Sequence, residues 1–383
     1  MQPLNMVIMS KRIYIITPTV GNINNAAARR INSFIEPLTQ EGFNVFVISS
    51  KCNQTQKNFK HIPTYIKLKS NKEGLILRAL YEILWGFEVL IRLIISPKNT
   101  LILGSSPPYL SFLIYGLIGL LNKNLILDIR DLYPEMYIYS NILDVNSKAV
   151  KLLKLYTAFI YKRARAITTV TNSMKSSIEI TLNKQNVSLI RNGFPKQLDK
   201  FSKKRYLDNE FRIVFHGTLG KVQNINLLVE IIDSLKLDKR IKFIVIGDGP
   251  KSNLIKECKG NLDYYRDMEF HDMFDLISTC HLGISLRNDG HIGRTAIPVK
   301  IYEYLGLGIP VICTPNSGDV YELQNEGFNI RMCKNQKKEI ILNLLDIQKN
   351  YQNRTYNNSQ FKSNLSREHQ SKNLIKLLNE ISG

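Results

Sequence analysis

Short apolar runs rich in β-branched residues alternate with helical stretches along the chain as far as about residue 333. This alternation constrains the fold more than any other feature, because strand–helix–strand repeats predict parallel sheets with helices on both faces. Runs such as IVFHG at 213–217 and FIVIG at 243–247 lack polar alternation, which is typical of strands buried on both faces. The sequence therefore predicts an α/β protein.

The expected strands form two groups, separated by the polar segment Pro195–Glu210. We therefore expect two doubly wound, Rossmann-like domains facing a central cleft, at 1–195 and 208–350. A terminal helix at about 366–383 is a candidate to pack back on the first domain. The expected strands are Arg12–Thr17, Asn44–Ser49, Thr100–Gly104, Leu125–Asp128, Ala166–Val170 and Ser188–Arg191, then Phe211–His216, Lys242–Gly247, Leu282–Leu286, Pro310–Thr314 and Phe328–Met332.

The formal net charge of +20 predicts attraction to an anionic partner, which could be nucleic acid, acidic lipid or a phosphorylated small molecule. The charge does not choose among them, and a chain-wide preference for Lys, Asn and Ile explains it equally well. Five scattered cysteines without a C-x-x-C pair argue against a disulfide framework or zinc ribbon and fit a reducing compartment. Because no secretory signal opens the chain, we expect a cytoplasmic protein.

One hydrophobic stretch, Leu75–Ile95, is long enough to span a bilayer. It is interrupted by four charged residues that share one narrow face at about 100° per residue, which predicts an amphipathic helix rather than a span. These residues are Arg78, Glu82, Glu88 and Arg92.

Residues suited to a phosphate-bearing ligand follow two strands of the second group. HGTLG at 216–220 contains Gly217 and Gly220 and precedes Lys221, and GDGP at 247–250 contains Gly249. Glycines after a strand let backbone N–H groups approach a phosphate, and the following helix start adds partial positive charge. Alone, each glycine turn is weak evidence, because any βα unit needs one.

The stronger signal is IPVKIYEYLGLGIPVIC at 297–313. Pro298 suits the start of a helix whose first turns carry Lys300 and Glu303. At the ligand edge of a sheet, such a carboxylate can accept both hydroxyls of a ribose, and the lysine can reach a diphosphate. The alternative is a carboxylate that offsets the helix dipole and a solvated surface lysine. Taken with the glycine turns, the ligand interpretation is favoured.

In the first group, LILDIRDLYPE at 125–135 places a charge cluster at the end of an apolar strand. Buried charges are costly unless they serve a ligand or pair with each other. A self-contained salt-bridge group of Asp128, Arg130 and Asp131 is therefore the alternative to a ligand site. The loops TPTVGNINN at 17–25 and GSSPP at 104–108 follow neighbouring strands and are expected at the same edge.

These motifs resemble, in their order, those of family-4 retaining glycosyltransferases of bacteria. The resemblance covers about Arg12–Met332 and includes SSPP, DIRDLYPE, RNG at 191–193, HGTLG-x-x-Q, IGDGP and P-x-K-x-x-E-Y-L-x-x-G-x-P-V-I. Within this family, the motifs are most similar to those of the branch that acts on lipid-linked O-antigen or capsule repeat units, often with UDP-N-acetylhexosamine donors. It implies a GT-B fold, a nucleotide-sugar donor in the C-terminal domain, an acceptor in the N-terminal domain and retention of configuration.

The resemblance also implies roles for single residues. Glu303 matches the second glutamate of the E-x7-E pattern, a ribose ligand, whereas the first falls at Thr295 and is missing. Arg130 replaces the histidine that precedes the acceptor-side aspartate in many relatives. Together the motifs and the resemblance give Asp131 and Arg130 as catalytic, Gly217, Gly220, Lys221, Gly249, Arg294, Lys300 and Glu303 as donor-binding, and Gly21, Asn22, Ser106 and Glu135 as acceptor-side residues.

Such a transfer needs a stabilised diphosphate rather than a strong base, and the chain has no D-x-D triplet or histidine cluster, so we expect neither metal nor cofactor. A nucleotide-sugar epimerase on the same fold is the alternative enzyme. A basic nucleic-acid-binding protein is the non-enzyme alternative, although no binding signature is present. The absence of G-x-G-x-x-G after a strand disfavours a dinucleotide oxidoreductase.

Finally, SKAVKLLKLYTAFIYKRAR at 147–165 predicts a helix that docks peripherally on an anionic membrane surface. The alternative is an ordinary core helix with a solvated basic face; the net charge and the implied lipid-linked acceptor favour docking. One side of the helix should carry Lys148, Lys151, Lys154, Lys162 and Arg165, and the other mostly Val150, Leu152, Leu153, Tyr156, Phe159 and Ile160.

Overall fold

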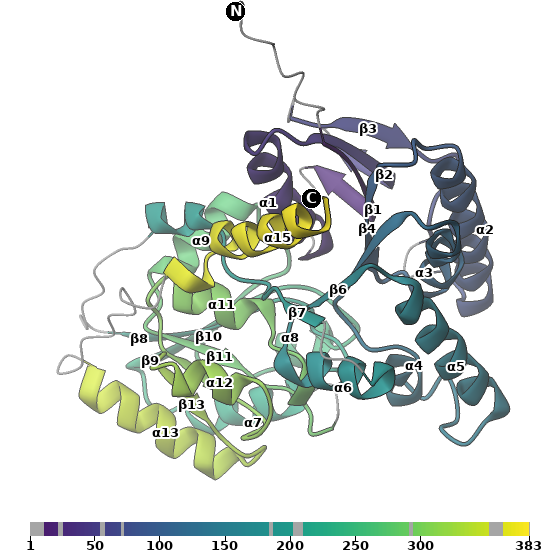
Figure 1. Ribbon diagram of the computed structural model, residues 1–383. Coiled ribbons are helices and arrows are strands. Elements are labelled where there is room, and N and C mark those ends of the chain that lie inside the picture. Colours follow the sequence, from purple (N-terminus) through teal and green to yellow (C-terminus); the bar gives the residue numbers. More distant parts are fainter. Residues whose placement is uncertain are drawn as a thin grey trace, which may run out of the picture. The chain divides into compact units, whose positions relative to one another are not determined.

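The computed structural model describes residues 11–21, 26–53, 58–69, 73–183, 187–201, 210–290, 294–351 and 363–382 (Figure 1). The chain divides into two compact units. Unit 1 comprises Met1–Val170, Met174–Ile190 and Ser371–Gly383, and unit 2 comprises Thr171–Ser173 and Arg191–Gln370.

Unit 1 is built on a parallel sheet with the order β3-β2-β1-β4-β5-β6-β7. Its strands are β1 Arg12–Gly21, β2 Asn44–Asn53, β3 Lys60–Pro63, β4 Leu101–Ser106, β5 Asn124–Ile129, β6 Ala166–Thr169 and β7 Val187–Leu189. The helices between them are α1 Ala26–Gln40, α2 Leu75–Ile94, α3 Tyr109–Tyr115, η1 Gly116–Leu121, α4 Glu135–Tyr139, α5 Lys148–Arg163 and α6 Asn172–Leu182.

The last helix of the chain, α15 Arg367–Ser382, contributes its residues from Ser371 onward to unit 1. Leu374 and Leu378 are buried in the same apolar cluster as residues of β1 and α1. At its edge, the Lys11 ammonium donates to Asn379 Oδ1 at 2.9 Å, and the Ser371 hydroxyl donates to the carbonyl of Ser33. This part of the helix is therefore held by apolar burial and by side-chain hydrogen bonds.

Unit 2 contains a second parallel sheet with the order β10-β9-β8-β11-β12-β13. Its strands are β8 Phe211–His216, β9 Ile241–Ile246, β10 Leu262–Tyr265, β11 Leu282–Ser285, β12 Val311–Cys313 and β13 Ile330–Met332. Its helices are η2 Lys196–Phe201, α7 Ile225–Ser234, α8 Ser252–Lys256, α9 Phe270–Ser278, α11 Val299–Gly306, α12 Val320–Asn325, α13 Lys337–Asn350 and η4 Ser363–Leu365.

Both sheets are doubly wound, which confirms the predicted pair of Rossmann-like α/β domains. The strand order reverses between β1 and β4 in unit 1 and between β8 and β11 in unit 2. Ligands of such sheets bind outside the carboxyl ends of the strands at the point of reversal. All the expected strands are present, β8 with the expected ends and the others with shifted ends, whereas the edge strands β3 and β10 were not expected.

The predicted amphipathic helix is present as α2, and within the described parts of the chain no helix is long and apolar enough to cross a membrane. The predicted basic helix is present as α5, with Ser147 accepting a hydrogen bond from the backbone of Val150 as its N-cap. Lys148, Lys151, Lys154 and Lys162 are exposed as expected, whereas Arg165 lies beyond the end of the helix at Arg163. One expectation is wrong, because Leu152 is exposed beside the lysines, as is its neighbour Leu155.

Candidate functional site

In unit 2, the loops that follow β8 and β9 pack tightly against each other. The Gly217 N–H donates to the carbonyl of Ile246 at 2.8 Å, and the Leu219 N–H donates to that of Asp248 at 3.0 Å. Gly247 has a φ of +145°, and a Cβ at this position would collide with the carbonyl oxygen of Gly217. Both loops therefore require glycine, which leaves backbone rather than side chains beside the point of strand reversal.

Lys300 lies in the first turn of α11 and projects against this loop. Its side chain is only 7% exposed, and its Nζ lies 3.7 Å from the centroid of the Phe215 ring. A Cβ on Gly217 would lie 3.4 Å from the same nitrogen. No described residue hydrogen-bonds to this ammonium. The alternative of a solvated surface lysine is therefore wrong.

The surroundings of Lys300 carry an excess of positive charge. Burial, helped by the nearby Arg287 guanidinium, lowers the pKa of Lys300 to about 7 against the opposing effect of Glu303. Arg287 follows β11, is itself buried, and donates to the carbonyl of Ala296 at 2.6 Å. The two cations Lys300 and Arg287 lie near the single carboxylate of Glu303. An anion bound here would therefore be stabilised, and it would raise the pKa of Lys300 so that this lysine stays charged.

Glu303 also lies on α11 and is only 1% exposed. Its Oε2 lies 2.9 Å from His216 Nε2, and its Oε1 lies 3.8 Å from the Arg367 guanidinium. The other ring nitrogen of His216 lies 2.9 Å from the Tyr304 hydroxyl. Glu303 therefore sits at the end of β8 next to Lys300, within a network that fixes the carboxylate in place.

The remaining predicted donor-binding residues lie in the same loops, but the structure does not bring all of them to Lys300. Gly220 and Gly249 lie in the loops after β8 and β9, and Gly249 N–H donates to Asp248 Oδ1. Lys221 and Arg294 are exposed. The Lys221 carbonyl accepts from Asn288 Nδ2 at 2.7 Å, which ties this loop to the segment after β11.

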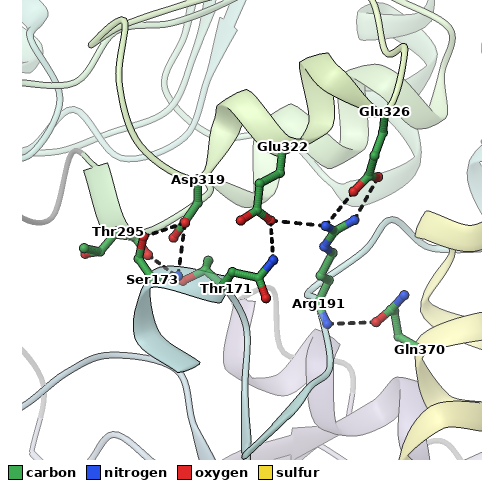
Figure 2. Close-up of polar contacts among 9 residues, drawn as sticks. Thr171, Ser173, Arg191, Thr295, Asp319, Glu322, Glu326 and Gln370 are labelled. Carbon is green, nitrogen blue, oxygen red and sulfur yellow. Dashed lines mark hydrogen bonds and ion pairs between the residues drawn. The ribbon is translucent and has the colours of Figure 1, made fainter. Parts of the chain in front are cut away.

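Polar contacts hold the segment around Thr295, the position of the missing glutamate (Figure 2). The Thr295 carbonyl accepts from the Thr171 hydroxyl at 2.7 Å, and the carbonyl of Arg294 accepts from the Asp319 N–H at 2.9 Å. Asp319 Oδ1 in turn accepts from the hydroxyl of Ser173 at 2.6 Å. The loop before α11 is therefore fixed by the start of α12 and by the short segment 171–173.

Arg191 of the RNG motif belongs to the same group of contacts. Its guanidinium donates to both oxygens of Glu326, at 2.9 and 2.7 Å, and to Glu322 at 3.2 Å (Figure 2). Its backbone N–H donates to Gln370 Oε1 at 2.8 Å. These contacts occupy the Arg191 side chain with two carboxylates, Glu322 of α12 and Glu326 at its C-cap, which gives this arginine a structural role in unit 2.

In unit 1, the buried Asp128 at the end of β5 pairs with an arginine that the sequence did not single out. Arg30 of α1 donates to Asp128 Oδ1 at 2.7 Å and to Oδ2 at 3.0 Å, and Thr168 donates to Oδ1 at 2.9 Å. Burial alone would raise the pKa of Asp128, but the Arg30 guanidinium, together with Arg130 and Thr168, outweighs it and lowers the pKa. The three residues Asp128, Arg130 and Asp131 do interact, but they are not a self-contained group, because Arg30 pairs with Asp128.

Arg130 and Asp131 lie just beyond this pair. Burial lowers the pKa of Arg130, while Asp128 and Asp131 act in the opposite direction. One guanidinium nitrogen of Arg130 donates to the carbonyl of Pro107 at 3.3 Å, and the Arg130 N–H donates to the carbonyl of Ser106. The loops after β4 and β5 thus meet, as predicted, and bring Ser106, Arg130 and Asp131 to one edge of the sheet.

The other acceptor-side candidates are Gly21, Glu135 and Asn22, and the structure places the first two in different elements. Gly21 ends β1 and exchanges two hydrogen bonds with the Asn32 side chain. Glu135 begins α4, where it forms an ion pair with Lys154 at 3.3 Å. Asn22 lies outside the described residues.

Sequence reasoning missed Arg287 and Arg30. Arg287 follows directly after the expected strand Leu282–Leu286, so its place at a strand end could have been noticed. Arg30 lies within a helix and carries no local signal, because its partner is 98 residues away in sequence.

Comparison with known proteins agrees with this architecture. Residues 210–350 match the family model described as "Glycosyl transferases group 1". A probable glycosyltransferase of Pseudomonas aeruginosa, WbjE, is 21% identical over 267 residues. The matched region covers 65% of this chain and 66% of that relative, which is less than two thirds of the relative's length.

Solved structures extend the likeness to nearly the whole chain. Anabaena Alr3699/HepE in complex with UDP superposes with a TM-score of 0.69 at 11% identity and covers 97% of this chain and 100% of that one. A putative UDP-N-acetylglucosamine 2-epimerase from Listeria monocytogenes gives a TM-score of 0.61 at 13% identity, covering 96% and 95%. The chain therefore has the GT-B fold of two Rossmann-like domains, and its segment 210–350 is similar to the glycosyl transferases group 1 family.

Proposed function

We propose that the protein is a retaining glycosyltransferase that moves a sugar from a nucleotide-sugar donor to a lipid-linked or saccharide acceptor in surface polysaccharide biosynthesis. The donor is proposed to be UDP-linked, in keeping with the UDP held by the Anabaena relative, and its sugar an N-acetylhexosamine. No metal or cofactor takes part in the proposed reaction.

The observation that carries this proposal is the buried Lys300 ammonium beside the glycine loop of unit 2. A charged group without a hydrogen-bond partner from the described residues costs stability unless a ligand uses it. Lys300 and Arg287 together offer positive charge beside the closely packed backbone of Gly217, at the point of strand reversal. A diphosphate matches this arrangement in charge and hydrogen bonding.

In the proposed reaction, the bond between the anomeric carbon and the diphosphate oxygen breaks, and the acceptor hydroxyl forms the new bond on the same face of the sugar. The proton of that hydroxyl passes to the leaving diphosphate. Lys300 stabilises the charge that develops on this leaving group, so no metal is needed. Glu303 is proposed to orient the donor ribose, together with the His216 imidazole to which it is bound.

Asp131 and Arg130 are proposed to shape the acceptor side in unit 1, with Ser106 of the adjoining loop. We further propose that the protein works in the cytoplasm, at an acidic membrane surface where a lipid-linked acceptor is presented. The exposed basic residues of α5 support this location.

Ligand titration tests the nucleotide preference directly. Thermal stabilisation by UDP, in preference to GDP, NAD or a single-stranded oligonucleotide, is the expected result; stabilisation by the oligonucleotide alone would instead indicate the nucleic-acid-binding alternative.

Product analysis separates transfer from the epimerase alternative, which the fold of the Listeria relative keeps open. A panel of UDP-sugars with and without lipid-linked saccharide should give a glycosylated lipid product only when both substrates are present. Conversion of the UDP-sugar into its epimer without an acceptor would refute the proposed transfer.

A further inference from the structure

Helix α2 presents its apolar side to the outside of unit 1 and its charged side to the protein. Along the helix, the apolar residues exposed to solvent recur every three or four positions, which defines one face. Ile76 is 86% exposed, Phe87 50% and Ile91 61%. The members of this apolar face are Ile76, Leu80, Ile83, Phe87, Ile91 and Ile94.

The charged side of α2 is used internally. The Glu88 carboxylate accepts from the backbone N–H groups of Tyr65 and Ile66, both at 2.9 Å, and from Arg92 at 2.8 Å. Burial alone would raise the pKa of Glu88, but these donors outweigh it and lower the pKa. On the same side, Glu82 accepts from the Leu110 N–H.

These contacts fix the rotation of the helix. Trp85 and Val89 are buried on the inner side, and the Trp85 indole N–H donates to the Thr64 hydroxyl at 2.9 Å. Turning the apolar face inward would leave the Glu88 carboxylate without its backbone donors and would expose the indole. The outward apolar face is therefore specified by the polar contacts of the opposite side.

The apolar face is long and uninterrupted. From Ile76 to Ile94 it extends about 27 Å at about 1.5 Å per residue, and none of its six members is charged. Exposed apolar patches larger than a few hundred Å² are uncommon on soluble monomers and mark interaction sites. Such a helix is suited to lying in the plane of a membrane interface, with its apolar face among the acyl chains.

The charge of the neighbouring elements favours a lipid surface. α2 contacts η1, which in turn contacts α5, and η1 itself carries two exposed leucines, Leu120 and Leu121. α5 carries no acidic residue. Its exposed basic residues are Lys148, Lys151, Lys154, Lys162 and Arg163. Apolar side chains flanked by basic ones match a leaflet that contains acidic phospholipids.

We infer that α2 is a membrane-insertion element: its apolar face enters an acidic phospholipid leaflet while α5 supplies the electrostatic attraction. A second copy of the chain fits this surface less well. A twofold contact through α2 and η1 would bring the like-charged α5 helices of both copies toward each other. The inference rests on the proposed function only for the choice of a lipid partner, and it assigns the main apolar contact to α2 rather than to α5.

Vesicle co-sedimentation tests this inference with the full chain. The probes are vesicles of phosphatidylglycerol with phosphatidylcholine and vesicles of phosphatidylcholine alone. A double variant with Phe87→Ser and Ile91→Ser should lose about tenfold or more in partitioning to the acidic vesicles, because it removes apolar surface from the middle of the face. The matched control carries Ile180→Ser and Leu342→Ser, two exposed apolar residues of α6 and α13, and should bind like the wild type.

Folding and donor binding are followed separately. All three proteins should melt at similar temperatures, because every substituted side chain is exposed, and all should bind UDP equally, because Lys300 lies in unit 2. A Phe87→Trp variant adds a direct readout, since its fluorescence should be quenched by brominated lipids. If none of the three proteins bound UDP, the proposed function would be refuted, but the conclusion from the vesicle experiment would not change.

Two outcomes would overturn the inference. One is equal binding of wild type and double variant to acidic vesicles, abolished by salt in both, since attraction through α5 alone then suffices. The other is a wild-type dimer that the double variant converts to monomer, with no vesicle binding by either, which would make α2 a contact between copies.

Discussion

Replacing Lys300 by methionine should make the protein more stable and a poorer binder of nucleotide at the same time. Lys300 is buried, its pKa is lowered to about 7, and no described residue hydrogen-bonds to its ammonium. Methionine keeps an unbranched side chain of similar length without the charge. The substitution therefore removes the unfavourable burial of a charge together with the group proposed to hold the diphosphate.

The size of the stability gain follows from the pKa shift. In the unfolded chain a lysine titrates at about 10.4, so between pH 7 and about 10 the unfolded state binds more protons than the folded state. Wild-type stability consequently rises with pH through this window, and the penalty is complete below pH 7. From the shift alone, the Lys300→Met protein should be more stable by about 5 kcal/mol at pH 6 and about 2 kcal/mol at pH 9.

The contact between the ammonium and the Phe215 ring opposes this gain by about 1–2 kcal/mol while the lysine is charged. A net gain of about 3–4 kcal/mol is therefore expected at pH 6. Urea denaturation at pH 6 and pH 9 measures both values. Lys221→Met is the matched control, because that lysine is exposed and its loss should change stability by at most about 0.5 kcal/mol.

UDP titration across the same pH range completes the test. If only the charged lysine binds the diphosphate, UDP affinity of the wild type should fall about 50-fold between pH 7 and pH 9, where a terminal phosphate with a pKa of about 6 is already ionised. Lys300→Met should bind weakly with no such pH dependence. A Lys300→Met protein that is less stable than wild type at pH 6, or that binds UDP equally well, would refute the reasoning.

Further predictions concern the rest of both units. Glu303→Ala should lower kcat/KM about 30- to 1000-fold in a folded protein, and wild-type kinetics would exclude the ribose role. Asp131→Asn should reduce transfer far more than UDP binding, whereas equal losses measured by titration and product assay would indicate a structural salt bridge. Arg30→Met should cost about 3–5 kcal/mol in urea denaturation, because it strands the buried Asp128 carboxylate, and adding Asp128→Asn should recover most of that loss. Activity should survive exhaustive chelation; activity that vanishes and returns with Mg²⁺ would exclude a metal-independent transfer.

The sequence alone predicted the doubly wound sheets because strands buried on both faces must be apolar throughout, as in β8 and β9. The same rule explains the two omissions. β3 (KHIP) and β10 (LDYY) are edge strands and partly exposed, so their sequences contain polar residues and resemble those of loops. Their assignment depends on pairing with β2 and β9, which a local pattern does not contain.

The sequence also placed candidate ligands at strand ends, since residues directly after a strand of a parallel sheet share one edge. It could not tell which lysine was buried, because Lys221 and Lys300 both lie in motifs suited to a phosphate. Only the packing of Lys300 against Phe215 and Gly217 distinguishes it. It could not pair Asp128 with Arg30, because the two residues meet only through the fold.

Helix α2 shows the same division most clearly. Periodicity was sufficient to predict an amphipathic helix, because the angular positions of side chains follow from the helix itself. Which face turns inward was decided by partners far away in sequence: the backbone N–H groups of Tyr65, Ile66 and Leu110 satisfy the carboxylates of Glu88 and Glu82, and so leave the apolar face outside. These backbone donors come from segments that reach α2 only in the folded protein, so the acceptors they need are assigned only by the tertiary structure.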